Sequence, residues 1–172
     1  MNSFLNLFRG FGGHPAHPPL TDASIGAYTA GTALVMAGWL GFMTDKFPMV
    51  KAGFLAIAVG LIFAVPTVIT GFADYFSIPR GNGMRRTANI HWLTMATSTG
   101  LFLLGECLLK NTYDTNNVTT AAGLTVLGAF ALLTVGGYVG GAIVFEYGMR
   151  VRNTPPETPA SEALKPKWPP TE

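Results

Sequence analysis

The chain has 172 residues, of which 49% are hydrophobic and only 12% are charged, and its formal net charge is +2. An ordinary soluble domain carries about 25% charged residues, so this composition argues against a water-soluble fold. The small net charge does not indicate nucleic-acid binding. The single cysteine, Cys107, excludes an internal disulfide or a cysteine-ligated iron–sulfur cluster within one chain. Too little polar sequence remains for a large catalytic domain, and we expect no independent enzymatic activity.

Four stretches of the chain contain no Asp, Glu, Lys or Arg, and they are residues 23–44, 52–73, 87–105 and 115–145. A helix needs about 20 predominantly apolar residues to cross a bilayer. The sequence therefore predicts an all-α fold, namely an integral membrane four-helix bundle with both termini on the same side. Its three parts are an N-terminal interfacial segment with a His-Pro motif (1–20), a four-helix transmembrane domain (21–152) and a proline-rich extended tail (153–172).

The limits of the predicted spans follow from the turn-forming residues between them. We expect spans at about Ala23–Thr44, Met49–Phe72, Thr87–Leu109 and Thr119–Phe145. The first span is expected to begin after a break at Pro18-Pro19, and Pro66 is expected to kink the second because proline removes one backbone hydrogen bond. The spans differ in length, glycine placement and polar content, so no internal repeat is expected.

Arginine is distributed unevenly between the two ends of the predicted bundle. The end that holds both termini has Arg9, Arg80, Arg85, Arg86, Arg150 and Arg152, whereas the other end has only Lys46, Lys51 and Lys110. Cytoplasmic loops of membrane proteins carry an excess of Lys and Arg. The sequence therefore predicts that the N- and C-termini are cytoplasmic.

Titratable side chains gather at the same arginine-rich end. His14 and His17 precede the first span, Asp74 closes the second, His91 begins the third and Glu146 closes the fourth. Ionisable groups at membrane depth are costly and usually mark a functional site. The cluster is therefore a candidate site, in which His17 and His91 are the better-placed pair of imidazoles.

His91, Asp74 and Glu146 also have a purely structural interpretation. His91 is expected either to bind a metal or to fix helix packing through a hydrogen bond. Asp74 and Glu146 are expected either to support the site or to pair with Arg85, Arg86 or Arg150. Glu106, at the opposite end, is expected to form an ion pair with Lys110 near the membrane surface.

Glycines in the fourth span predict close helix packing. Gly136, Gly137, Gly140 and Gly141 form two overlapping GxxxG patterns, which allow another helix to approach the backbone. The partner helix is expected either within the chain or in a second copy, so an oligomer through this helix is one possibility.

Four segments carry a resemblance to a known family, and they are HPAHPPLTDASIGAY, TGFADYFSIP, ANIHWLTMATST and GGAIVFEYGMRV. Their order and spacing resemble those of the bacterial membrane family called domain of unknown function 2231 (DUF2231), over nearly all of residues 13–152. The family motifs match His14, Pro15, His17, Pro18, Gly71, Asp74 and His91. Family members sometimes occur fused to, or beside, Rieske-type iron–sulfur domains. The resemblance thus implies redox work in a bacterial inner membrane, with other membrane or redox subunits, such as a Rieske-type protein, as partners.

One functional hypothesis is a small b-type cytochrome-like electron-transfer protein or redox-complex subunit, with one haem b near the cytoplasmic face. His17 and His91 would be its axial ligands, His14 the substitute, and Arg85 and Arg86 would pair with the haem propionates. Three histidines cannot supply four axial ligands, so one chain cannot hold two bis-histidine haems.

Two alternatives belong to other classes of protein. In the first alternative, the chain is a cofactor-free accessory subunit of a larger membrane complex. It would dock through the glycine faces of its helices and through its tail, which contains Trp168. Alternatively, it would be a non-haem metal-binding membrane protein that uses His17, Asp74, His91 and Glu146, whose nitrogen and oxygen donors suit a metal ion.

Overall fold

The computed structural model describes residues 8, 10–11, 14–42, 48–151 and 157–163. Two short strands, β1 (Gly10–Phe11) and β2 (His14–Pro15), pair antiparallel before the first long helix. The helices are α2 (His17–Trp39), α3 (Met49–Tyr75), α4 (Gly83–Lys110), α5 (Thr120–Phe145) and the short α6 (Ala160–Ala163). The predicted turn after the first span and most of the tail, with Trp168, lie outside the described residues.

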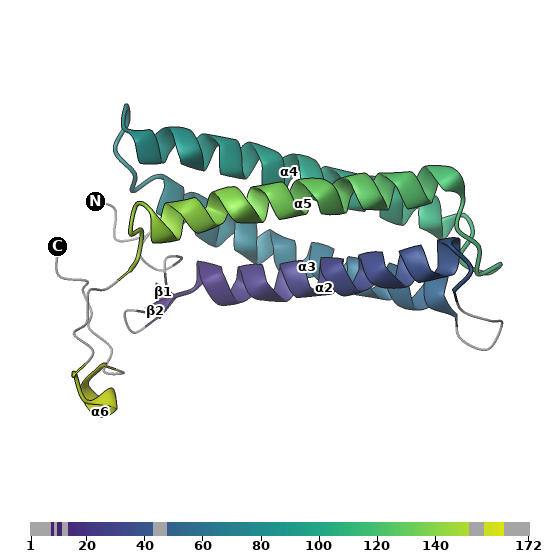
Figure 1. Cartoon of the computed structure of the whole chain (residues 1–172), viewed down its shortest axis with the longest axis horizontal. Helices are drawn as coiled ribbons and strands as arrows, with labels where there is room; N and C mark the ends of the chain where they lie inside the picture. Colours follow the sequence, from purple (N-terminus) through teal and green to yellow (C-terminus); the bar gives the residue numbers. More distant parts are fainter. Residues whose placement is uncertain (1–7, 9, 12–13, 43–47, 152–156, 164–172) are drawn as a thin grey trace.

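The four long helices form an elongated bundle of two helical hairpins (Figure 1). Helix α2 packs mainly against α3, and α4 packs mainly against α5, while contacts between the hairpins are sparser. The beginnings of α2 and α4 and the ends of α3 and α5 lie at one end of the bundle. We call this the histidine end, because it contains His17 and His91, and we call the other the lysine end, because it contains Lys51 and Lys110.

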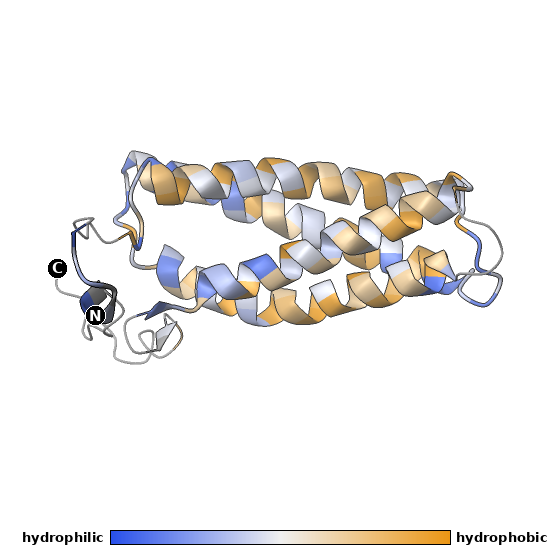
Figure 2. Ribbon diagram, turned by 60° about the horizontal axis from the view of Figure 1, so that its bottom comes forward, coloured by the Kyte–Doolittle hydropathy of each residue, from blue (hydrophilic) through white to orange (hydrophobic). Residues whose placement is uncertain are grey.

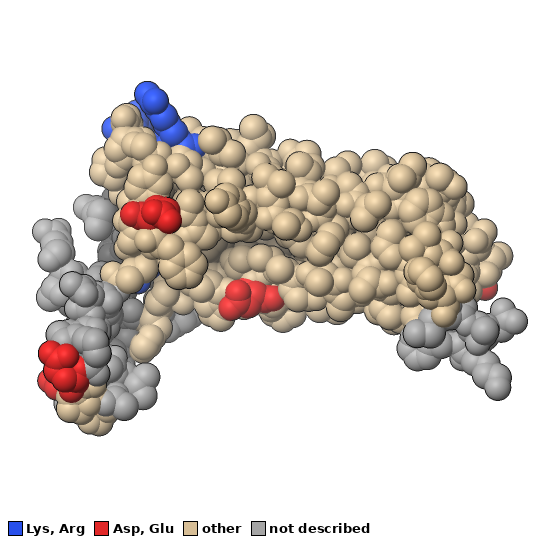
Figure 3. All heavy atoms as spheres, in the orientation of Figure 1, with Lys and Arg blue, Asp and Glu red and all other residues tan. Residues whose placement is uncertain are grey.

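The outer surface of the bundle is apolar along most of its length (Figure 2). Large side chains such as Ile62, Val65 and Leu93 are more than half exposed. Figure 3 shows a long part of the bundle surface without charged side chains on the face drawn there. Helices α3, α4 and α5 are each long and apolar enough to cross a bilayer. Helix α2 is not among these candidates, because threonines, serine, glycines and Asp22 dilute its apolar residues.

The prediction for the beginning of the first helix is wrong. Helix α2 begins at His17 and includes Pro18 and Pro19 in its first turn, instead of starting after them. Proline is tolerated there because the first N–H groups of a helix have no partner within the helix. The predicted second span also ends too early, since α3 continues through Pro66 to Tyr75.

Two buried apolar clusters are separated along the bundle axis. The larger one lies toward the lysine end and includes Tyr28, Ile57, Phe102 and Val126. The smaller one lies at the histidine end and consists of Ile78, Ala88 and Ile143, with partly buried neighbours. Between them the helices contribute polar or very small residues, which are His17, Thr21, Ser24, Thr67, Thr70, Gly71, Asp74, His91, Gly136 and Gly140. This polar layer contains the candidate site.

The two hairpins resemble one another, so the expectation of no internal repeat is wrong. Helices α2 and α4 carry identical or similar residues at positions 74 apart (91 − 17 = 74). The identical pairs are His17 and His91, Ser24 and Ser98, Gly26 and Gly100, and Gly31 and Gly105, and the similar pair is Tyr28 and Phe102. Helices α3 and α5 correspond at positions 69 apart (140 − 71 = 69), where Gly71 and Gly140 are identical. The shared residues fall largely on the inner faces of the helices.

The packing repeats together with the sequence. A Cβ atom on Gly31 would lie 2.6 Å from Ile57 Cγ1, and one on Gly105 would lie 2.7 Å from Cγ2 of Val126, the residue equivalent to Ile57. Parallel repeats in membrane proteins are related by an axis along the membrane normal. The chain therefore consists of two similar hairpins, α2–α3 and α4–α5, which are arranged about an approximate two-fold axis parallel to the bundle.

Candidate cofactor site between two histidines

His17 is held against α3 at the start of α2. Its Nδ1 lies 3.0 Å from the carbonyl oxygen of Thr67 and 3.3 Å from Oγ1 of Thr70. A carbonyl oxygen can only accept, so Nδ1 carries the proton in the neutral ring and Nε2 keeps its lone pair. Among the described residues, the Nε2 atom has only a long contact of 3.4 Å, with Oγ1 of Thr21, whose hydroxyl donates to the His17 carbonyl at 2.9 Å.

The imidazole of His17 is seated on a glycine of the facing helix. A Cβ atom on Gly71 would lie 2.8 Å from His17 Cε1 and 3.2 Å from Nδ1, which is too close for any larger residue unless the ring moves. Gly71 follows Thr67 by one helical turn. The carbonyl group that accepts the hydrogen bond and the glycine that contacts the ring therefore belong to the same face of α3.

His91 is held against α5 in the same way. Its Nδ1 lies 2.9 Å from the carbonyl oxygen of Gly136, and a Cβ atom on Gly140 would lie 2.8 Å from His91 Cε1. Gly136 and Gly140 are the positions equivalent to Thr67 and Gly71. The same tautomer follows, with the proton on Nδ1 and the lone pair on Nε2.

The two imidazoles are therefore equivalent parts of the two hairpins. Both are half-buried, and His91 lies close enough to affect the electrostatic environment of His17. His14, in contrast, is exposed in β2, where it pairs with Phe11. Of the two histidines before the first span, it is His17 that reaches the bundle interior.

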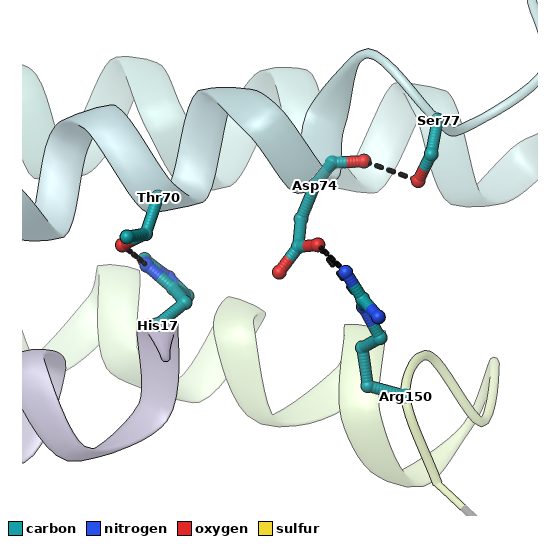
Figure 4. A network of polar contacts seen from close by, with 5 residues as sticks. All are labelled: His17, Thr70, Asp74, Ser77 and Arg150. Carbon is teal, nitrogen blue, oxygen red and sulfur yellow. Dashed lines mark hydrogen bonds and ion pairs between the residues drawn. The ribbon is translucent and has the colours of Figure 1, made fainter. Parts of the chain in front are cut away.

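Asp74 forms an ion pair at the edge of the same layer (Figure 4). Arg150, just after α5, donates from Nε at 3.0 Å and from Nη2 at 2.5 Å to the Asp74 oxygen Oδ1. The Asp74 side chain is 9% exposed and that of Arg150 is 22% exposed. The predicted pairing of Asp74 with one of the three arginines is confirmed for Arg150, and the pair joins α3 to the end of α5. Asp74 also acts electrostatically on His17.

The other predicted residues have different positions. Arg85 donates from Nη1 to the carbonyl oxygens of Tyr75 and Ile78, at 2.6 and 3.1 Å, and its guanidinium lies over the Tyr75 ring. It therefore satisfies the carbonyl groups at and just beyond the end of α3. Arg86 and Glu146 are exposed at the histidine end.

The described residues contain no group of three or more His, Cys, Asp or Glu side chains that could hold a metal ion. His17, Asp74, His91 and Glu146 are thus not assembled into one such group. What the structure brings together is a pair of imidazoles, each with a defined tautomer.

Several residues of the site were not predicted as such. Thr67 and Gly136 contribute backbone carbonyl groups, which no residue type reveals, and Gly71 and Gly140 act by lacking a side chain. The 74-residue spacing of His, Ser, Gly and an aromatic residue is the signal that would have identified the equivalent positions.

A family model described as "Predicted membrane protein (DUF2231)" matches residues 13–153. The search of curated proteins found no match, and the search of solved structures found none either.

Proposed function

The chain belongs to the DUF2231 family of predicted membrane proteins, and from this premise we propose that it is a b-type cytochrome-like electron-transfer protein. It holds one haem b between His17 and His91. The observation that carries the proposal is the equivalent setting of these two histidines. Each has its Nδ1–H bound to a carbonyl oxygen of the facing helix, and each ring is seated on a glycine.

The chemistry of the donor pair fits a haem. A histidine that ligates a metal almost always donates its other ring N–H to a carbonyl, a carboxylate or water, which fixes the tautomer and the orientation of the ring. His17 and His91 both meet this condition. Two imidazoles are too few for a closed tetrahedral metal site, whereas a haem requires only two axial ligands from the protein and supplies the rest itself.

The bound haem would supply one-electron chemistry at its iron, and the residues of the chain supply the setting. Four-helix bundles build cofactor sites from side chains on facing helices. Gly71 and Gly140 keep each imidazole close to its partner helix, and the hydrogen bonds at Nδ1 prevent the rings from turning. The Asp74 carboxylate, which is paired with Arg150, lies close enough to His17 to contribute to the electrostatic potential of the site.

We further propose that the histidine end faces the cytoplasm of a bacterial inner membrane. Arg80, Arg85, Arg86 and Arg150 lie at this end, whereas the described lysine end has Lys51 and Lys110. The positive-inside rule supports this orientation. A single haem near one face exchanges electrons with a partner on that face, such as a Rieske-type redox subunit. Arg86, which is exposed there, is available to a haem propionate or to such a partner.

The proposal is tested by the visible spectrum of the purified protein, expressed with haem supplied. The wild-type chain is expected to show a Soret band. His17→Ala and His91→Ala are both expected to lose it. His14→Ala is the matched control, because His14 is exposed and lies outside the bundle, and it should retain the band. A wild-type protein without haem under the same conditions would contradict the proposal and favour the cofactor-free accessory subunit.

A further inference from the structure

A second polar site lies inside the bundle, toward the lysine end. Glu106 is only 8% exposed, and within the described part of the chain neither of its carboxylate oxygens has a hydrogen-bond partner. The predicted ion pair with Lys110 is absent among the described residues, where Asp74–Arg150 is the ion pair recorded. Lys110 is exposed, whereas Glu106 is turned inward.

The hydroxyl group of Tyr28 belongs to the same site. Tyr28 lies on α2 and is 1% exposed, and its hydroxyl has no hydrogen bond of normal geometry to any described residue. It lies within the electrostatic influence of Glu106, and Thr99 is a polar neighbour of the hydroxyl. Two buried polar groups without a hydrogen-bond partner among the described residues therefore lie on α2 and α4, close enough to interact electrostatically.

No cation faces Glu106 from any helix of the bundle. The α2 segment 23–39, the α3 segment 52–73 and all of α5 contain no charged residue, and Tyr28 and Tyr138 are the titratable groups in these segments. Tyr138 is 84% exposed on α5, and Cys107, the neighbour of Glu106 on α4, is also exposed. Lys51, at the start of α3, lies over the ring of Tyr113.

A buried carboxylate without a counter-ion is very unfavourable, and such groups usually become neutral by taking up a proton. A metal ion would need several more oxygen donors than one carboxylate and one or two hydroxyl groups provide. We infer that Glu106 and Tyr28 form a proton-binding site inside the bundle. In this site the carboxyl group takes up one proton from water, and the Tyr28 hydroxyl interacts with it.

The position of Glu106 indicates the side from which the proton arrives. Glu106 precedes Lys110, the last residue of α4, by one helical turn, or about 6 Å along the axis at 1.5 Å per residue. His91 is 15 residues away (106 − 91 = 15), or about 22 Å along the same helix. The proton therefore exchanges with water at the lysine end, opposite to the proposed haem, and the site does not depend on haem binding.

Infrared spectroscopy of the purified full-length protein tests this inference. A change from acidic to alkaline buffer is expected to remove the carbonyl-stretch band of a buried protonated carboxyl group from the wild-type spectrum. Glu106→Gln, a neutral variant of the same shape, is expected to lack this band at every pH, while Glu146→Gln, which alters an exposed carboxylate, should keep it. Absence of the band from the folded wild type, or its persistence in Glu106→Gln, would overturn the proposal.

Two further measurements separate the parts of the site. Tyr28→Phe removes only the hydroxyl group and is expected to shift the pH midpoint of the band, and this test holds even if Glu106→Gln folds poorly. An unchanged midpoint would remove Tyr28 from the site. Replacement of potassium by sodium at constant ionic strength is expected to leave the midpoint unchanged. Loss of the band in sodium would mean that a cation, and not a proton, occupies the site.

Discussion

Tyr28 and Phe102 occupy equivalent positions in the two hairpins and stack on one another, with ring centroids 4.1 Å apart and planes inclined by 1°. Equivalent residues meet face to face only when they lie beside the axis that relates the two copies. Both rings are almost fully buried, so the stack joins the hairpins at the centre of the larger apolar cluster. His17 and His91 precede these rings by the same 11 residues (28 − 17 and 102 − 91).

The stack is expected to couple the hairpins energetically. Tyr28→Leu and Phe102→Leu should each lower the thermal stability of the bundle. Because aromatic pairs contribute about 0.5–1.5 kcal/mol beyond the burial of their area, the double variant should lose less than the sum of the two single variants. A double-mutant cycle by thermal unfolding in detergent measures this coupling. Additive effects would mean that the stack does not hold the hairpins together.

The close contact between each histidine ring and a glycine of the facing helix gives a sharper prediction. Gly140→Ala places a methyl group 2.8 Å from His91 Cε1, which is closer than side-chain carbon atoms normally approach one another. Since overpacking costs about 1–3 kcal/mol, the ring is expected to move and haem retention to fall about tenfold or more, which corresponds to about 1.4 kcal/mol. The haem-to-protein ratio after gel filtration measures the loss.

Gly137→Ala is the matched control on the same helix. A Cβ atom there has no neighbour within 4 Å, and alanine is better than glycine in a helix by about 0.5–1 kcal/mol. The variant should bind haem normally and be at least as stable as the wild type. Equal haem loss in both variants would show that helix α5 responds to any added methyl group and that the contact between Gly140 and His91 has no special role.

The Asp74–Arg150 pair is expected to stabilise the histidine end. Arg150→Gln leaves the buried Asp74 carboxylate without this partner, and breaking a buried pair from one side costs about 3–5 kcal/mol. The thermal midpoint in detergent should therefore fall clearly, and Asp74→Asn in the same chain should recover part of the loss because it removes the buried charge that Arg150 had paired. A double variant less stable than Arg150→Gln alone would contradict the buried-pair interpretation.

The orientation of the bundle can be tested at Ser161, which lies in α6 and is exposed. A cysteine is introduced at Ser161 in a Cys107→Ser background, and intact cells are treated with a membrane-impermeant thiol reagent. We expect no labelling until the cells are permeabilised, because the proposed orientation places the histidine end in the cytoplasm. Ready labelling of intact cells would reverse the proposed orientation.

Much of the fold could be predicted because a bilayer imposes a simple pattern on the sequence. Charge-free stretches of about 20 residues identified the helices, and the prediction for the fourth span differs from α5 by one residue at its start. The start of α2 was missed because proline both breaks a helix interior and fits a first turn. The sequence alone does not show whether Pro18 and Pro19 end a preceding segment or form the first turn of a helix.

The candidate site was predicted only in part. The histidines and Asp74 were identified because titratable groups in a membrane are rare. The partners of the histidines are the Thr67 and Gly136 carbonyl groups, which every residue possesses. The repeat escaped notice because α2 and α4 share few residue types, spaced so that they fall on one helical face. The lack of a partner for Glu106 could not be foreseen either, since a lysine one turn away suggested an ion pair.

The central claim, that one haem is held by two equivalent histidines, is tested most directly by electron paramagnetic resonance of the oxidised protein together with its haem content. The account predicts one haem per chain, with the low-spin signal of an iron that has two imidazole ligands. It also predicts that the signal is lost in both His17→Ala and His91→Ala. A high-spin signal in the wild type, or a low-spin signal that survives either substitution, would contradict it.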